Sequence, residues 1–141
     1  MSNPYVGQDA ASPQVASARG LATAVYALQA ASFVLGFTVF IGLVINYIKM
    51  DEVRGTWVES HFRWQIRTAW LWLAFGLLLT IGLVMLVLGT AGAAVAGSEA
   101  GAMGGMLSVT TVGLVGGLGL AAWFVYRIVK GWLRLAANQP I

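Results

Sequence analysis

Hydrophobic residues in this sequence occur in three long runs that contain no charged side chain. Asp, Glu, Lys and Arg are absent from 29 positions at residues 20–48, from 31 at residues 68–98 and from 27 at residues 100–126. A helix rises 1.5 Å per residue and needs about 20 apolar residues to cross the hydrocarbon core of a bilayer. The pattern therefore predicts three membrane-spanning helices, near residues 25–48, 69–88 and 107–126.

The predicted fold class is all-α, an integral membrane protein with three transmembrane helices and one amphipathic interfacial helix. Membrane β-strands would alternate polar and apolar residues over about ten positions, and LWLAFGLLLTIGLVMLVLG at 71–89 does not alternate. The following Gly- and Ala-rich stretch, with the lone Glu99, is interpreted as frayed helix ends joined by a turn. Composition agrees, because 9% of the residues are charged, against about a quarter in soluble domains.

The interfacial helix is predicted over residues 56–67, on the basis of two stripes at helical spacing. The apolar stripe consists of Val58, Phe62, Ile66 and Ala69, and the charged stripe of Glu59, Arg63 and Arg67. Such a pattern is typical of a helix with one buried and one solvated face. Thr56 and Glu59 have the spacing of a capping box. A single transmembrane domain is expected over residues 21–135, between a disordered tail at 1–20 and a C-terminal tail at 136–141.

The basic residues predict the orientation. Three spans would place seven of the eight on one side, namely Lys49, Arg54, Arg63, Arg67, Arg127, Lys130 and Arg134. Arg19 would lie on the other side. Basic loops favour the cytoplasm, so we expect the N-terminus outside and the C-terminus inside. Because these residues border membrane spans, the net charge of +3 gives no reason to expect nucleic acid as a partner.

Candidate chemistry is concentrated in HFRWQIRTAW at 61–70, which holds the only histidine. One interpretation is a packed or interfacial imidazole that bonds a carbonyl or Glu59. The other is that His61 and Gln65, one turn apart, contact a ligand or a partner. With no cysteine, no second histidine and no nucleophile motif, we expect no catalytic residue, no metal site and no cofactor.

Two further sets of residues have predicted roles in membrane and helix contacts. Lipid headgroups are the expected partners of Arg63, Arg127, Lys130 and Arg134. For the C-terminal segment, the alternative is docking against the 56–67 helix or a partner protein. Close helix packing is expected at Gly113, Gly117 and Ala121, because small residues four apart let helix backbones approach.

The segment TWVESHFRWQIRT at 56–68, with YRIVKGWLRLAANQPI at 126–141, resembles small bacterial membrane proteins related to the Tic translocon channel component of the chloroplast inner envelope. The resemblance implies a bacterial inner membrane location. It also implies motif positions at Thr56, Trp57, Ser60, His61, Phe62, Gln65 and Arg67. Plastid relatives are associated with a protein-conducting channel, whereas most bacterial relatives have no assigned activity.

The functional expectation is a non-enzymatic membrane protein that acts through helix–helix contacts, as an accessory or assembly subunit. Its expected partners are the lipid bilayer and either a membrane protein or further copies of the chain. The alternative is a homo-oligomeric channel or transporter component, similar to the translocon relatives. Three helices cannot enclose a pore for a polypeptide, and transport paths usually need ionisable groups at mid-depth, which the charge-free runs lack.

Overall fold

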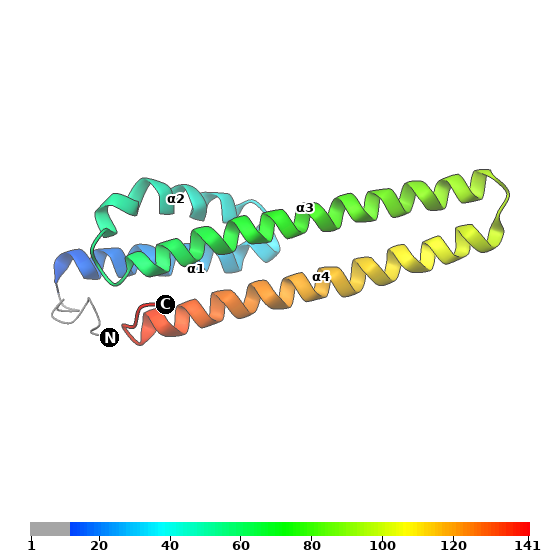
Figure 1. The fold of residues 1–141 in the computed structure, drawn as a ribbon. Coiled ribbons are helices and arrows are strands. Elements are labelled where there is room, and N and C mark those ends of the chain that lie inside the picture. Colours follow the sequence, from blue (N-terminus) through cyan, green and yellow to red (C-terminus); the bar gives the residue numbers. More distant parts are fainter. Residues whose placement is uncertain (1–11) are drawn as a thin grey trace. The chain divides into compact units, whose positions relative to one another are not determined.

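The computed structural model describes residues 12–141, and this part of the chain contains four helices and no strand. The helices are α1 (Pro13–Leu35), α2 (Thr38–Val53), α3 (Glu59–Val95) and α4 (Glu99–Ala136) (Figure 1). The all-α prediction is therefore confirmed. Of these helices, α1, α3 and α4 are long and apolar enough to cross a membrane.

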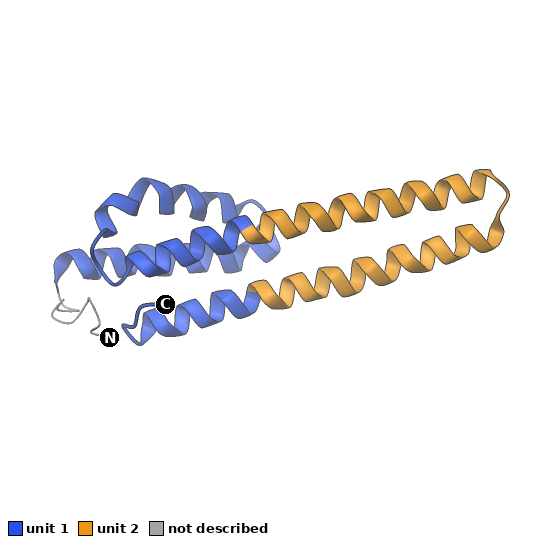
Figure 2. Ribbon diagram, viewed as in Figure 1, with its two compact units in different colours: residues 1–70, 125–141 blue, residues 71–124 orange. Residues whose placement is uncertain are grey.

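The chain divides into two compact units (Figure 2). Unit 1 comprises residues 1–70 and 125–141, and unit 2 comprises residues 71–124. Unit 1 thus holds α1, α2, the beginning of α3 and the end of α4. The remainder of α3 and α4 forms unit 2.

In unit 1, α1 and α2 form an antiparallel hairpin. Helix α1 ends at Leu35 because Gly36 has a φ of 71°, in the left-handed region that glycine tolerates best. The Gly36 N–H closes the last turn on the Ser32 carbonyl at 2.8 Å. Near the turn, Thr38 Oγ1 donates to the Leu28 carbonyl at 2.8 Å. At the far end, Gln14 Nε2 donates to the Glu52 carbonyl at 3.1 Å.

The single span predicted over residues 25–48 is therefore wrong. A charge-free run reports that a segment is apolar, but it does not report the direction of the chain, which reverses at Gly36. The reversal places the start of α1 beside the end of α2. The external N-terminus stays a prediction. Residues 13–20, predicted as part of a disordered tail, form the first turns of α1; residues 1–11 lie outside the described part.

The segment expected as a separate interfacial helix is divided between a turn and the start of α3. Gly55 makes the turn with a φ of 77°, and the helix begins at Glu59. Thr56 does not cap it, since its hydroxyl donates back to the Val53 carbonyl at 2.7 Å. The capping box is not formed either, because the Thr56 N–H donates to the Val53 carbonyl at 3.1 Å and the Glu59 carboxylate accepts from the Gly55 N–H at 3.0 Å instead.

Unit 2 is an antiparallel pair formed by residues 71–95 of α3 and 99–124 of α4, joined through Gly97. Half-buried positions alternate spacings of three and four along α3, at Trp72, Gly76, Leu79, Leu83, Leu86, Thr90 and Ala93. The opposing positions on α4 include Ala102, Gly105, Val109, Gly113, Gly116, Leu120 and Trp123. A repeat near 3.5 residues is typical of helices that pack along a continuous seam.

The glycines of α4 show the register of this seam. A Cβ added to Gly113 would lie 3.7 Å from Leu83, and one added to Gly116 would lie 2.8 Å from Leu79. A Cβ added to Gly117 would meet nothing within 4 Å, and Ala121 is half-buried. The small residues pressed against α3 are thus Gly113 with Gly116, three apart, and not Gly113 with Gly117, because the seam follows 3.5 residues per repeat.

Candidate functional site

The only histidine lies at the centre of unit 1, on the first turn of α3, and is fully buried. Its Nε2 lies 2.8 Å from the Gln139 carbonyl oxygen. A carbonyl can only accept, so Nε2 carries the proton. Its Nδ1 lies 3.1 Å from the Tyr26 hydroxyl, which donates to it in the neutral ring. Both nitrogens of His61 therefore have partners inside the chain, one on α1 and one beyond the end of α4.

Two aromatic neighbours fix the orientation of this imidazole. The Trp57 and Tyr26 rings meet it edge to face, with centroids 5.7 Å and 6.2 Å away. Gly131 on α4 borders the Tyr26 ring, because an added Cβ would lie 2.6 Å from Tyr26 Cζ. Only a glycine there admits the buried tyrosine. His61 thus ties α1 and α3 to the segment that follows α4.

Two buried glutamines join α1 and α3 by reciprocal bonds. Gln65 Nε2 donates to the Ala22 carbonyl at 2.9 Å, and Gln29 Nε2 donates to the Gln65 carbonyl at 3.2 Å. The two side-chain amide oxygens are buried and have no hydrogen-bond partner among the described residues. Asn46 of α2 is also buried, and neither polar atom of its side chain has a partner there. Buried groups of this kind are destabilising unless they are satisfied.

Arg127 is part of the packing between α3 and α4 in unit 1. Its guanidinium carbon lies 3.6 Å from the centroid of the Trp64 ring, and its Nε donates to Thr68 Oγ1 at 2.8 Å. Trp64 Nε1 donates in turn to the Arg127 carbonyl at 3.2 Å. A cation stacked on indole stabilises by about 0.5–2 kcal/mol. Arg127 therefore has a packing role besides any contact with headgroups.

The segment after α4 folds back onto the beginning of α3. The Ile141 N–H donates to Ser60 Oγ at 3.0 Å, while Ser60 Oγ donates to the Trp57 carbonyl at 2.9 Å. Arg134 holds the same segment by donating to the Pro140 carbonyl at 3.1 Å. Of the two roles expected for the C-terminal segment, this geometry supports docking against the region of residues 56–67.

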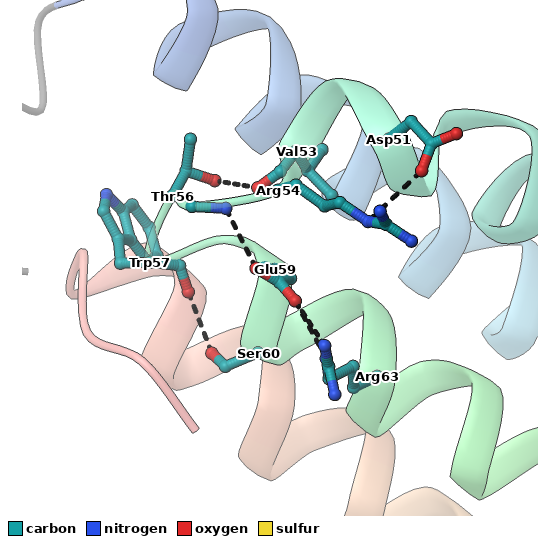
Figure 3. A network of polar contacts seen from close by, with 9 residues as sticks. Asp51, Val53, Arg54, Thr56, Trp57, Glu59, Ser60 and Arg63 are labelled. Carbon is teal, nitrogen blue, oxygen red and sulfur yellow. Dashed lines mark hydrogen bonds and ion pairs between the residues drawn. The ribbon is translucent and has the colours of Figure 1, made fainter.

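The turn before α3 carries an exposed network of charges (Figure 3). The Arg63 guanidinium donates to the Glu59 carboxylate at 2.6 Å, and Arg54 pairs with Asp51 at 3.2 Å. The Gly55 N–H, followed by Arg63, holds the pKa of Glu59 below its usual range. Arg63 is thus paired with an acid, although it remains exposed and free to approach a headgroup.

The positions implied by the resemblance lie in unit 1 and, with one exception, turn inward. Thr56, Trp57, His61, Phe62 and Gln65 are buried, and Ser60 is half-buried. Arg67 is exposed, as is Lys130, whose amino group lies 5.7 Å from the Trp64 ring. The sequence interpretation missed three partners, Tyr26, Gly131 and Gln139. Of the three, only Tyr26 gave any signal in the sequence, since a tyrosine often has a buried ring with a hydrogen-bonded hydroxyl. A single sequence gives no signal for contacts between residues this far apart.

The described residues contain no group of three or more His, Cys, Asp or Glu side chains placed to hold a metal ion. Chemically, the site joins helices by hydrogen bonds and stacking around one imidazole. Comparisons of the chain with models of protein families, with curated proteins and with solved structures found no match.

Proposed function

We propose that this chain is a non-enzymatic multi-pass protein of the bacterial inner membrane that serves a larger membrane complex as an accessory or assembly subunit. The observation that carries the proposal is the outer face of unit 2. Its two helices bury only one seam, and large apolar side chains elsewhere on both are exposed, among them Leu77, Leu78, Met85, Leu88, Met106, Leu107, Leu114 and Leu118. Lipid or the helices of a partner must cover these faces.

Outward glycines on α3 favour a partner helix over lipid alone. Gly82, Gly89 and Gly92 are exposed, and a Cβ at any of them would meet nothing within 4 Å. Glycine inside a helix costs roughly 0.5–1 kcal/mol relative to alanine, and these three gain no close contact within the chain. Small residues do allow a second helix backbone to approach closely in a membrane.

The use of polar side chains inside unit 1 supports a non-catalytic role. Both ring nitrogens of His61 have internal partners, and the Ser60 hydroxyl bridges Trp57 and Ile141. A catalytic base must reach a substrate proton, whereas His61 is fully buried. Helix joining is the role that this geometry supports best.

The alternative, a homo-oligomeric channel or transporter component, follows from the resemblance to the Tic translocon family. A transport path usually needs ionisable or strongly polar groups at mid-depth. Residues 71–124 contain one charged side chain, Glu99, and it lies at the start of α4. This distribution favours the accessory role.

The test compares Gly89→Leu with Val84→Leu by native mass spectrometry of protein extracted in mild detergent. Both positions are exposed on α3, but only the first substitution fills an open glycine. We expect the wild type and the Val84 variant to retain a bound membrane protein, and the Gly89 variant to lose it with no loss of thermal stability. Equal retention by both variants, or a wild type that runs only at 14.9 kDa, would contradict the proposal. Assemblies of this chain alone that conduct ions in liposomes would favour the alternative.

A further inference from the structure

The turn of the α1–α2 hairpin presents a continuous apolar surface. Its exposed side chains are Phe33, Val34, Leu35, Phe37, Phe40 and Ile41, of which Val34 is 87% exposed. Further along α2, Val44 and Ile48 are exposed as well. A surface of this kind on a folded chain marks a contact with lipid or protein.

The polar side chains of the same segment turn inward. Thr38 is buried with its hydroxyl on the Leu28 carbonyl, and Asn46 is 1% exposed. The exception is Tyr47, whose hydroxyl accepts from Trp70 Nε1 at 3.0 Å. Tyr and Trp with their polar tips are typical of the headgroup zone. The arrangement is thus apolar outside and polar inside, as acyl chains require.

The length of α2 shows how deep this surface can reach. Its charge-free part runs from Thr38 to Ile48, before Lys49, Asp51 and Glu52. These 11 residues span about 16 Å at 1.5 Å each, which is roughly half of a 30 Å hydrocarbon core. Helix α2 is therefore too short to cross the bilayer. Helix α1 is long and apolar enough to cross, but its start lies beside the end of α2, where Gln14 bonds the Glu52 carbonyl, so both ends of the hairpin lie together.

The charges of unit 1 indicate which side of the membrane the base of the hairpin faces. The base is the end formed by the start of α1 and the end of α2. All eight basic residues of the sequence lie in unit 1, and the only charged residue of unit 2 is Glu99. Arg19 on α1 lies at the base with the others, since its guanidinium donates to the Ala136 carbonyl at 3.4 Å. With Arg19 included, all eight basic residues lie on the same side of the membrane, and such a bias favours the cytoplasmic side.

We propose that α1 and α2 form a re-entrant hairpin whose turn is buried among the acyl chains of one bilayer leaflet. Ser12, Arg54 and Ala136 then face the same compartment, the cytoplasm, and only α3 and α4 cross the membrane. The occupant of the apolar surface is lipid, because the surface is apolar at the turn and ends at charged residues near the base. This inference does not depend on the proposed function.

Single-cysteine labelling tests the proposal cleanly because the sequence has no cysteine. The variants are Ser17→Cys, Val34→Cys, Ala100→Cys and Ala137→Cys, all at exposed positions. Each is first checked for wild-type thermal stability. A membrane-impermeant maleimide is then applied to right-side-out and inverted vesicles, and an environment-sensitive fluorophore at position 34 is exposed to brominated phosphatidylcholine in liposomes.

We expect positions 17 and 137 to be labelled only from the cytoplasmic side and position 100 only from the opposite side. Position 34 should not be labelled by the impermeant maleimide from either side. A fluorophore attached there should be quenched by the brominated lipid. Labelling of position 17 from the same side as position 100 would mean that α1 crosses the membrane, and would overturn the proposal. Aqueous labelling of position 34 without lipid quenching would overturn it as well.

Discussion

The Tyr26 hydroxyl lies 3.1 Å from Nδ1 of His61, and this buried pair joins α1 to α3. On the other side of the ring, Nε2 bonds the Gln139 carbonyl at 2.8 Å. The imidazole therefore acts as a bridge between segments that are 35 and 78 positions away from it in the sequence. Its lone occurrence in the chain fits a structural role of this kind.

Replacing Tyr26 with Phe should destabilise unit 1. The substitution keeps the ring but leaves Nδ1 of His61 without its donor, and a buried group left unsatisfied costs about 1–3 kcal/mol. Thermal unfolding in detergent, followed by tryptophan fluorescence, measures the loss. Tyr126→Phe is the matched control because Tyr126 is 58% exposed. Equal melting temperatures for the two variants would mean that the buried pair contributes nothing.

Two adjacent glycines on α4 should respond in opposite directions to alanine. A Cβ at Gly105 would lie 3.0 Å from Thr90 Cβ and still closer to its hydroxyl, whereas one at Gly104 would meet nothing within 4 Å. Gly105→Ala should lower the free energy of unfolding by about 1–3 kcal/mol through overpacking. Gly104→Ala should gain up to roughly 1 kcal/mol from helix propensity. The same unfolding assay compares them, and a gain for both would refute the register of the seam.

Asn46→Leu should leave stability unchanged or raise it. Neither polar atom of this buried amide has a partner among the described residues, so an apolar side chain of similar size removes a desolvation cost of about 1–3 kcal/mol. Gln65→Met is the contrast, because it breaks the 2.9 Å bond to the Ala22 carbonyl and should lower the melting temperature. A loss at Asn46 as large as that at Gln65 would show that the asparagine has a partner.

Part of the stability should be lost as the pH is lowered, and this part depends on Glu59. The residue lies ahead of the charge-free part of α3. Its pKa is lowered in the folded state, chiefly by the Gly55 N–H and then by Arg63. The stabilisation is therefore present above about pH 4.3, the ordinary value for glutamate, and is lost as pH falls through the lower folded pKa. In melting curves at several pH values, Glu59→Gln should be less stable than the wild type at neutral pH. The difference should shrink in acid, and a constant difference would contradict this linkage.

How much could be predicted from the sequence differs between the two units. The spans expected at residues 69–88 and 107–126 lie within α3 and α4. Here the long apolar run was enough to predict a helix, because the chain does not reverse within either run. The expected span at 25–48 failed because apolarity alone does not distinguish one long helix from two short ones that turn at Gly36.

The candidate site shows the same limit. His61 and Gln65 stand out as polar residues one turn apart, and both are buried in unit 1. Their partners come from distant parts of the chain, such as Tyr26 and Gln139 for the imidazole. Periodicity within a helix predicts which side chains share a face, but it carries no information on which other helix meets that face.

The hairpin of α1 and α2 is the central claim, and intramolecular cross-linking of Gln14→Cys with Glu52→Cys tests it most directly. In the hairpin, Gln14 Nε2 lies 3.1 Å from the Glu52 carbonyl oxygen, whereas a continuous helix would separate the two positions by about 57 Å. Gln14→Cys with Phe37→Cys is the control, because Gln14 lies at the start of α1 and Phe37 lies just beyond its end. We predict that a short bismaleimide joins positions 14 and 52 within one chain, seen by mass spectrometry, and does not join 14 and 37. Absence of the 14–52 product in membranes, with both cysteines reactive, would contradict the hairpin.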